Sequence, residues 1–458
     1  MPEEGTEIES TANVAVDREK TVEKEERNLY ERYFEDKEPQ LVKTLKAAYQ
    51  TRYGQELLES LGIDPQDISY RDFSLKVPLV SSREVGQDPK RFTRGNTEEI
   101  YHVSSTGTTG KPKEFYFPKS EFIVQFPDAF TKIIQESENP VLIHRNESVD
   151  YKIIETSLQA IRPDIGLEFY NDANGVLESI KKADTIYLIT EVTKFRVLMY
   201  QIKNLLEDDP SILKQLKGKQ LFVEIGSEPV DFKELQTWFM YLKEIIGEEP
   251  DFVVTYGLND TGIIGTYRYK DGDTEEDFKY RVANTRLIEV LDNTGKLVFG
   301  QRGNVISTTF RDEGSILVRY LTGDEGVLSI DNEGKVYLSR IGRNPEDGML
   351  NFAGKKVFVP GFYDFLREKL DIPFQLEVQV LENLGNLFNV LNITLYSDEF
   401  ADSNKANFAK EEVHAKLTGY ASLPILIGRG TLNLNINASD QLPEDFTKGW
   451  RILPKQAV

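Results

Sequence analysis

The chain has 458 residues and is acidic, with 55 Lys and Arg against 76 Asp and Glu and a formal net charge of −21. This balance argues against a broad surface for nucleic acid or an anionic membrane, because both require a basic field. The sequence has no cysteine and three histidines. Disulfides and thiolate catalysis are therefore excluded, and a histidine-based metal site is disfavoured. No apolar run approaches the ~18 residues of a membrane span, so we expect a cytoplasmic protein.

The first 28 residues are polar and charge-dense. We expect them to be largely disordered and, because no apolar stretch follows Met1, to carry no secretory signal. Apolar residues then recur at helical spacing through Leu41, Leu45 and Ala48, which predicts a helix. A serine cap and a further helix are expected within Pro78–Val85.

From about residue 100 onward, apolar strands and amphipathic helices alternate, which favours an α/β core. Strands are predicted at 99–103, 185–190 and 220–225, and helices at 195–206 and 232–246. After residue 280 the texture changes to short strands and turns, which predicts a small β subdomain. Its strands are expected at 286–291, 305–309, 316–320 and 336–338, with turns at 292–295 and 331–334.

A domain boundary is expected at 342–348, where Pro and Gly interrupt every pattern. The residues beyond it are enough for a separate small α+β domain, and residues 442–458 are expected to form a loop. The predicted fold class is therefore α/β. A large N-terminal domain with α/β sheets and a small β subdomain precedes a small α+β C-terminal domain.

A loop rich in glycine and hydroxyl groups follows the predicted strand at 99–103. Its sequence is Ser104-Ser-Thr-Gly-Thr-Thr-Gly-Lys-Pro-Lys113. Glycines permit backbone conformations in which successive N–H groups converge on one anion, while hydroxyls and lysines add donors and positive charge. It is not a Walker loop, which needs glycine at Ser105 and Ser or Thr at Pro112. We expect a polyphosphate site, with a polar surface turn as the alternative. The residues expected to bind are Ser104, Ser105, Thr106, Gly107, Thr108, Thr109, Gly110, Lys111 and Lys113.

This loop resembles the signature of adenylate-forming enzymes, which include acyl-CoA synthetases, luciferases and peptide-synthetase adenylation domains. Four further segments resemble motifs of that superfamily and follow in the expected order. They are Gly226-Ser-Glu-Pro229, Tyr256-Gly-Leu-Asn-Asp260, Arg319-Tyr-Leu-Thr-Gly-Asp324 and Gly342-Arg343 with Glu346-Asp347. The resemblance spans about residues 75–452. Phenylacetate–CoA ligases are the most similar subgroup, because they are also short and precede the loop with an element like Val77-Pro-Leu-Val-Ser81.

The resemblance implies a role for each motif. Asp260 stands where the superfamily has Glu and would hold Mg²⁺, since it remains a hard oxygen ligand. Asp324 would accept hydrogen bonds from both ribose hydroxyls, and Arg343 would contact ribose or phosphate. Residues of two turns would frame the adenine, Tyr256 by stacking: Gly226, Ser227, Glu228, Pro229, Tyr256 and Gly257. The alternatives are that Asp324 caps a turn, that Tyr256 and Gly257 form a plain strand-end turn, and that Arg319 is a surface strand residue.

The resemblance also implies a mobile C-terminal domain. The superfamily carries a catalytic lysine near its end, and Lys448-Gly-Trp-Arg451 keeps the Lys-x-x-Arg spacing, with Thr447 where glycine is usual. Lys448 and Asp260 are therefore the candidate catalytic residues; Lys455 is a rival that lacks the spacing. The implied hinge is Asp347, with Glu346 as the alternative, between a core at 29–342 and a lid domain at 349–458.

The predicted function is activation of a small carboxylic acid by ATP and Mg²⁺ to an acyl-adenylate, followed by transfer to coenzyme A. One alternative is transfer to an amine or a carrier protein. Another is a non-catalytic nucleotide-binding relative, which the departures at Asp260 and Thr447 favour. Residues 120–220 carry little family sequence, and aromatic residues there, such as Phe122, Phe126 and Phe130, are more often core than pocket. The acid is therefore not predicted. No nucleic-acid or membrane partner is expected, and the protein is expected to be a monomer or homodimer.

Overall fold

The computed structural model describes most of the chain. The described residues are 28, 30–58, 61–62, 64, 69–95, 100–104, 114–118, 135–136, 140–144, 162–163, 166–169, 173–258, 260–343, 349–352, 355–358, 363, 366–367, 370, 372–383, 386–417, 432–441 and 450–457. The predicted disordered N-terminus, apart from Asn28, lies outside them, as do Phe122, Phe126 and Phe130. No helix in the described part is long and apolar enough to cross a membrane.

The chain divides into two compact units. The first unit comprises Met1–Ile100, Asp260–Tyr267 and Phe278–Gly342. The second unit comprises Tyr101–Asn259, Arg268–Asp277 and Arg343–Val458. Each unit is therefore assembled from stretches that are distant in the sequence.

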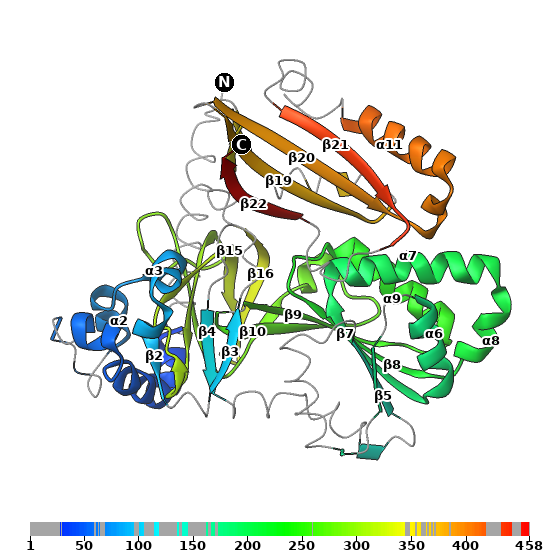
Figure 1. Ribbon diagram of the computed structural model, residues 1–458. Coiled ribbons are helices and arrows are strands. Elements are labelled where there is room, and N and C mark those ends of the chain that lie inside the picture. The colour runs from blue at the N-terminus through cyan, green and yellow to red at the C-terminus, as the bar shows by residue number, and fades with distance from the viewer. Residues whose placement is uncertain are drawn as a thin grey trace, which may run out of the picture. The chain divides into compact units, whose positions relative to one another are not determined.

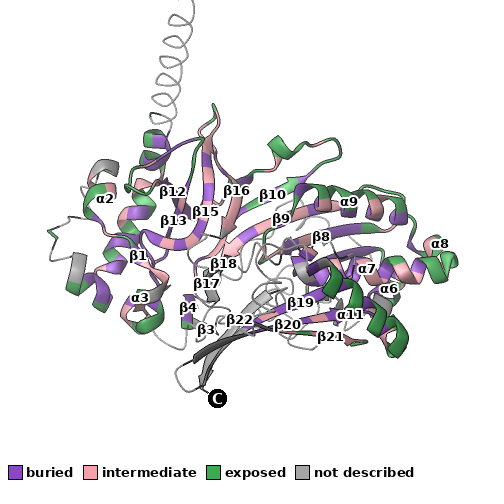
Figure 2. Ribbon diagram, turned by 90° about the horizontal axis from the view of Figure 1, so that it is seen from above, coloured by how far each residue is buried: buried purple, intermediate pink, exposed green. Residues whose placement is uncertain are grey.

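The first unit contains an antiparallel sheet whose strands run in the order β12-β13-β15-β16-β11-β10. Their bounds are β10 Gly262–Tyr269, β11 Tyr280–Val282, β12 Arg286–Leu291, β13 Arg302–Thr309, β15 Tyr320–Ile330 and β16 Val336–Arg343. Figure 2 shows how buried residues follow β12, β13 and β15. Every residue of β12 is buried, so both faces of this strand are covered. Short strands complete the unit: β1 Val80–Ser81 pairs in parallel with β15, and β2 Thr93–Arg94 pairs with β14 Gly314–Ser315.

Helices at the start of the first unit pack on this sheet. The predicted helix around Leu41 and Leu45 spans 30–48, and both residues are fully buried. The hydroxyl of Tyr30 donates to the carbonyl of Ile288 at 2.5 Å, which fastens this helix to β12. Two short helices follow, α2 Tyr70–Lys76 and α3 Ser82–Gln87. The capping box between Ser81 and Glu84 confirms the predicted serine cap of α3.

One predicted strand of the β subdomain is wrong. Residues 316–319 form no strand, and β15 begins only at Tyr320. The backbone of Arg319 is left-handed (φ 48°), which breaks an extended strand. Its side chain is buried against Glu289, with Nε–Oε2 at 3.0 Å, so Arg319 is not a surface strand residue.

The second unit contains a parallel sheet with the strand order β9-β8-β7-β5-β6. Its strands are β5 Pro140–His144, β6 Gly166–Phe169, β7 Thr185–Glu191, β8 Gln220–Gly226 and β9 Asp251–Leu258. Figure 1 shows the helices of this unit alongside β7, β8 and β9. They are α6 Ala173–Lys182, α7 Val192–Asp208, α8 Leu213–Leu216 and α9 Phe232–Ile246. The strands and helices predicted at 185–246 are confirmed, as are the turns at 292–295 and 331–334 of the first unit.

Aromatic packing joins the helices of the second unit to its sheet. Phe195 of α7 lies edge-on to Trp238 of α9 and to Phe252 of β9, with ring centroids 5.0 and 5.5 Å away. Asp231 caps α9 through the backbone N–H groups of its first turn, and Gly247 ends it in a left-handed conformation.

The predicted strand at 99–103 is β3 Ile100–Ser104, which pairs with β4 Glu114–Pro118.

The C-terminal part of the second unit has its own sheet, in the order β21-β20-β19-β22, and a helix, α11 Ser403–Leu417. The strands of this sheet are β19 Phe374–Asn383, β20 Asn386–Tyr396, β21 Leu432–Ser439 and β22 Trp450–Ala457. A separate two-stranded sheet pairs β17 Met349–Phe352 with β18 Lys355–Phe358. Leu376, Ile393 and Val413 belong to the buried core of this C-terminal part. The prediction of a loop for the tail is wrong at 450–457, because β22 gains ladder hydrogen bonds by parallel pairing with β19. The α/β fold class is confirmed.

Short helical turns occur in both units. They are a π-helical turn at Gly54–Leu58 and 3₁₀ turns at Pro89–Phe92, Pro210–Ile212, Glu275–Asp277 and Asp398–Ala401.

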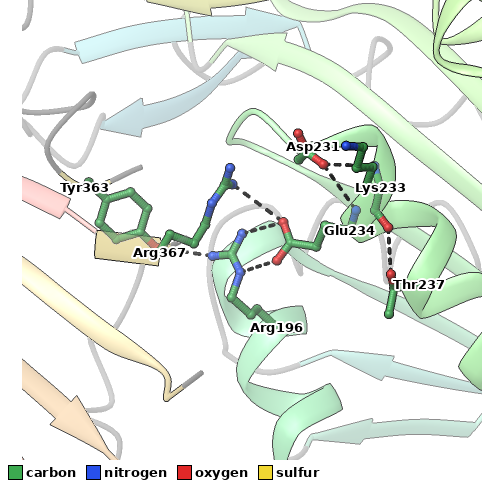
Figure 3. Close-up of polar contacts among 7 residues, drawn as sticks. All are labelled: Arg196, Asp231, Lys233, Glu234, Thr237, Tyr363 and Arg367. Atoms are coloured by element: carbon green, nitrogen blue, oxygen red, sulfur yellow. Dashed lines mark hydrogen bonds and ion pairs between the residues drawn. The ribbon is translucent and has the colours of Figure 1, made fainter. Parts of the chain in front are cut away.

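A charged network links α7 and α9 to Tyr363 and Arg367 within the second unit. Arg196 binds the carboxylate of Glu234 through two nitrogens, at 2.5 and 3.0 Å, and donates to the hydroxyl of Tyr363 at 3.2 Å. Figure 3 shows the guanidinium of Arg367 directed at the same carboxylate, 3.6 Å away. Two cations thus share one acidic partner.

Candidate functional site

Part of the predicted site falls outside the described residues. This holds for Ser105, Thr106, Gly107, Thr108, Thr109, Gly110, Lys111, Lys113, Asp347 and Lys448. Ser104 is the last residue of β3 and Arg343 the last residue of β16. The strand before Ser104 was predicted, whereas β16 extends further than expected, to Arg343. The roles of both residues remain predictions.

The turn predicted to frame the adenine begins at the carboxyl end of β8. Gly226 is the last residue of this strand and pairs with Thr255 of β9. A Cβ at Gly226 would lie 2.8 Å from the carbonyl oxygen of Thr255, so the two strands approach too closely for any other residue. Ser227 then adopts a left-handed backbone (φ 71°), which turns the chain away from the sheet toward Glu228 and Pro229.

The second predicted adenine contact lies on the neighbouring strand. Tyr256 and Gly257 are near the carboxyl end of β9, and Tyr256 is 9% exposed. The structure therefore brings the Gly226 turn and Tyr256 to adjacent strand ends of one parallel sheet. Ligands of open α/β sheets bind at this edge.

Hydrogen bonds between side chains join β7, β8 and β9 near this edge. The hydroxyl of Tyr187 on β7 donates to Glu224 on β8, and the hydroxyl of Thr255 on β9 donates to the other carboxylate oxygen of Glu224 at 2.9 Å. Burial and the nearby charge of Glu224 hold the pKa of Tyr187 well above its usual value. Tyr187 therefore stays a donor, and the group ties β7 and β9 to β8 beside Gly226.

In the first unit, Asp260 lies in the turn before β10 and meets a residue that sequence reasoning did not assign. The fully buried Tyr320 donates its hydroxyl to the Oδ2 atom of Asp260. Tyr320 belongs to the same Arg-Tyr-Leu-Thr-Gly-Asp segment as Asp324. Its position inside that motif is the sequence signal from which it could have been predicted as a candidate site residue.

Asp324 lies in a β-bulge of β15. Opposite Val305, three residues of β15 (322–324) fit between the paired positions Leu321 and Glu325. Gly323 permits this through a left-handed backbone (φ 78°). Bulges of this kind redirect a side chain at functional sites. Asp324 is 5% exposed and lies four residues from Tyr320, at most about 13 Å along the strand.

Two arginines also converge on the residue after Asp260. The guanidiniums of Arg286 and Arg311 both donate to the carbonyl oxygen of Thr261, the second at 3.1 Å. Both arginines are almost fully buried, with 2% and 5% of their surface exposed, and Thr261 is completely buried. Neither arginine stands in a recognisable motif, which is why the sequence did not single them out.

The residues around Asp260 fit a magnesium ion that also binds phosphate. In the described part of the chain no three His, Asp or Glu side chains gather into a metal-binding group. Mg²⁺ does not need such a group, because it is commonly held by one or two carboxylates together with substrate phosphates and water. Tyr320 occupies one carboxylate oxygen of Asp260, and Oδ1 accepts no hydrogen bond from the described residues. One hard oxygen donor is therefore available.

Comparison with solved structures shows what this fold resembles. 2-Hydroxyisobutyryl-CoA ligase, in the postadenylation state in complex with R3-HIB-AMP, matches with a TM-score of 0.56 and 14% identity. The match covers 91% of this chain and 88% of that ligase. The same ligase in its thioesterification state, with 2-hydroxyisobutyryl-AMP and coenzyme A, gives a TM-score of 0.52, 14% identity and coverage of 95% and 90%.

The chain has the fold of an adenylate-forming CoA ligase. The predicted resemblance is therefore confirmed for the fold over nearly the whole chain. The phenylacetate–CoA ligase subgroup stays a prediction, because the matching ligase acts on a different acid. No protein-family model matches the sequence, and neither does any curated protein.

Proposed function

We propose that this protein activates a carboxylic acid with ATP and then transfers the acyl group to coenzyme A. In the first step a carboxylate oxygen bonds to the α-phosphorus, and the bond from that phosphorus to the bridging oxygen breaks. Pyrophosphate leaves and an acyl-adenylate remains. In the second step the thiol sulfur bonds to the acyl carbon, AMP leaves with the bonding electron pair, and the thiol proton passes to solvent.

The observation that carries this proposal is the strand β15. It bears Asp324 in a bulge, and its first residue, Tyr320, binds the carboxylate of Asp260. The two acids predicted to contact ribose and cation, 64 positions apart in the numbering (324 − 260), are thus gathered along one strand. Five motifs in the expected order and the shared ligase fold support the same conclusion.

Each group of residues has a proposed task. Asp260 would hold Mg²⁺, which supplies charge neutralisation to the phosphates when bound. Asp324 would accept hydrogen bonds from the ribose, and the Gly226 turn with Tyr256 would bind the adenine. The loop Ser104–Lys113 would hold the β- and γ-phosphates, with Arg343 on ribose or phosphate. Lys448 would stabilise the charge that builds on the α-phosphate, which makes it the proposed catalytic lysine.

The movement of the C-terminal part belongs to the same proposal. Rotation of a lid domain at 349–458 about Asp347 would let Lys448 serve the first step and leave before the second. Lys448→Ala should then abolish adenylate formation yet spare thioester formation from supplied acyl-adenylate. Equal loss of both half-reactions would remove Lys448 from this role.

Isotope exchange between pyrophosphate and ATP tests the proposal. Purified protein is incubated with ATP, Mg²⁺, labelled pyrophosphate and a panel of acids that includes phenylacetate and short hydroxy acids. We expect acid-dependent exchange, and release of AMP when coenzyme A is added. Exchange without turnover of coenzyme A would point to an amine or carrier-protein acceptor. No exchange with any acid, despite ATP binding, would refute acid activation.

A further inference from the structure

We propose that Tyr320, Arg286 and Arg311 are positioning residues that hold Asp260 ready for its cation. This inference rests on the proposed function, since it assigns these three residues a task toward the magnesium–nucleotide complex. All of the contacts that carry it lie within the first unit.

The segment of Asp260, Thr261 and Gly262 is fixed at three consecutive points. Tyr320 donates its hydroxyl to the Asp260 side chain, and the two arginines donate to the Thr261 carbonyl. Gly262 then adopts a left-handed backbone (φ 78°), which starts β10 in a new direction. The Asp260 side chain, the Thr261 carbonyl and the backbone at Gly262 are therefore all held in place within one short loop.

The arginines are themselves fixed by the sheet that they come from. Arg286 is the first residue of β12 and also donates to the Thr285 carbonyl at 3.0 Å. Arg311 follows the end of β13 and donates to the Ser315 carbonyl at 3.3 Å. The rigid planar fork of arginine suits this arrangement, because one guanidinium can bind two carbonyls at once.

Burying two guanidiniums is costly, because each gives up its hydration. Backbone carbonyls can be satisfied by neutral donors, so stability alone does not call for two charged groups at Thr261. A loop that must place one carboxylate oxygen against a cation does call for rigidity, since small displacements weaken coordination and catalysis. The geometry thus indicates that the two arginines hold the backbone of the loop in place and that Tyr320 orients the Asp260 carboxylate.

Tyr320→Phe is the sharpest test, because it removes only the hydroxyl. Calorimetry measures the affinity of the full-length protein for ATP, once with Mg²⁺ and once with EDTA. We expect binding with Mg²⁺ to weaken about tenfold, as for a lost hydrogen bond to a charged group, while binding in EDTA stays unchanged. Tyr30→Phe is the matched control, since Tyr30 is also fully buried in the first unit and donates to a carbonyl. It should bind both forms like the wild type.

Variants of Arg311 test the backbone half of the inference. Arg311→Met should weaken binding with Mg²⁺ by a similar factor, and Arg311→Lys should recover part of the loss because lysine can still reach one carbonyl. Hydrogen exchange of the peptide around residues 260–262, measured without ligand, should rise in Tyr320→Phe and Arg311→Lys but not in Tyr30→Phe. This readout serves if Arg311→Met fails to fold.

The outcomes separate the inference from the function on which it rests. If Tyr320→Phe binds ATP with Mg²⁺ as tightly as the wild type does, the positioning role alone is overturned. Equal losses with Mg²⁺ and with EDTA would overturn it too, because they would indicate a general structural defect. Wild-type protein that takes up no ATP in the presence of Mg²⁺ would overturn both.

Discussion

At the scale of single residues, the candidate site depends on positions that only glycine can occupy. Gly226 has no room for a Cβ beneath the Thr255 carbonyl, and Gly323 supplies the left-handed backbone of the bulge at Asp324. Both glycines stand inside motifs that the sequence displays openly. A glycine in such a motif is therefore required physically, by a close approach of two backbones or by a left-handed backbone conformation.

Gly226→Ala should be destabilising for this reason. A Cβ 2.8 Å from a backbone oxygen forces β8 and β9 apart, at a cost of about 1–3 kcal/mol. Urea unfolding followed by circular dichroism would measure the change in free energy. Gln215→Ala, an exposed position of α8, serves as the control and should stay close to the wild type. A Gly226→Ala variant as stable as this control would contradict the close approach.

Sequence reasoning reached the residues that carry local signals and missed those that depend on tertiary contacts. Asp260 and Asp324 stand in segments that resemble superfamily motifs, so the resemblance could single them out. Arg286 and Arg311 could not be singled out, because an arginine at a strand end looks the same whether it faces water or a buried carbonyl. The strand β22 was missed for a related reason. Its sequence, Trp-Arg-Ile-Leu-Pro-Lys-Gln-Ala, contains a proline and does not alternate regularly, and it forms a strand through pairing with β19.

At the scale of elements, a turn with strong local hydrogen bonds follows β12 in the β subdomain. The carboxylate of Asp292 accepts from the backbone N–H of Thr294 at 2.8 Å, from its hydroxyl at 2.7 Å and from the N–H of Lys296 at 3.0 Å. These bonds close a tight turn after β12, and the residues that follow pair back on the end of that strand through Leu291 and Leu297. The turn was predicted correctly because Asp-Asn-Thr-Gly carries its own hydrogen-bonding chemistry.

Asp292→Asn should reveal a pH-dependent contribution of this turn. The hydrogen bond from the Thr294 hydroxyl, with those from the backbone, lowers the pKa of Asp292 in the folded state. Its contribution is therefore present above the unfolded-state pKa of about 4 and is lost as the pH falls through the lower folded-state pKa. We expect wild type to be more stable than the variant at pH 7, with the gap closing toward pH 3. A gap independent of pH would contradict this origin.

At the scale of the whole molecule, the network at Glu234 ties α7 and α9 of the second unit to Tyr363 and Arg367. Burial alone would lower the pKa of Arg196, yet the hydrogen bond to Glu234 and the neighbouring charges raise it. An apolar contact between Val197 and Tyr396 lies in the same part of the unit. A small contact built mainly on charge is expected to weaken with salt.

Glu234→Gln should loosen this connection, because it leaves Arg196 and Arg367 without their shared anion. The expected loss is about 2 kcal/mol, since the side chains are 18–22% exposed rather than deeply buried. Limited proteolysis should become faster in the C-terminal part. Glu325→Gln, which breaks the more exposed pair with Arg302, is the matched control. Equal cleavage rates in both variants would contradict a linking role for Glu234.

The bond from Tyr30 to Ile288 has a consequence for how the chain is made. Its two ends are 258 positions apart, so at 5–20 residues per second a ribosome needs roughly 13–50 s to deliver the second after the first. During that interval the apolar face of the helix at 30–48 has no sheet to cover it. Until β12 has been made this face stays exposed, and exposed apolar surface makes an incomplete chain prone to aggregate.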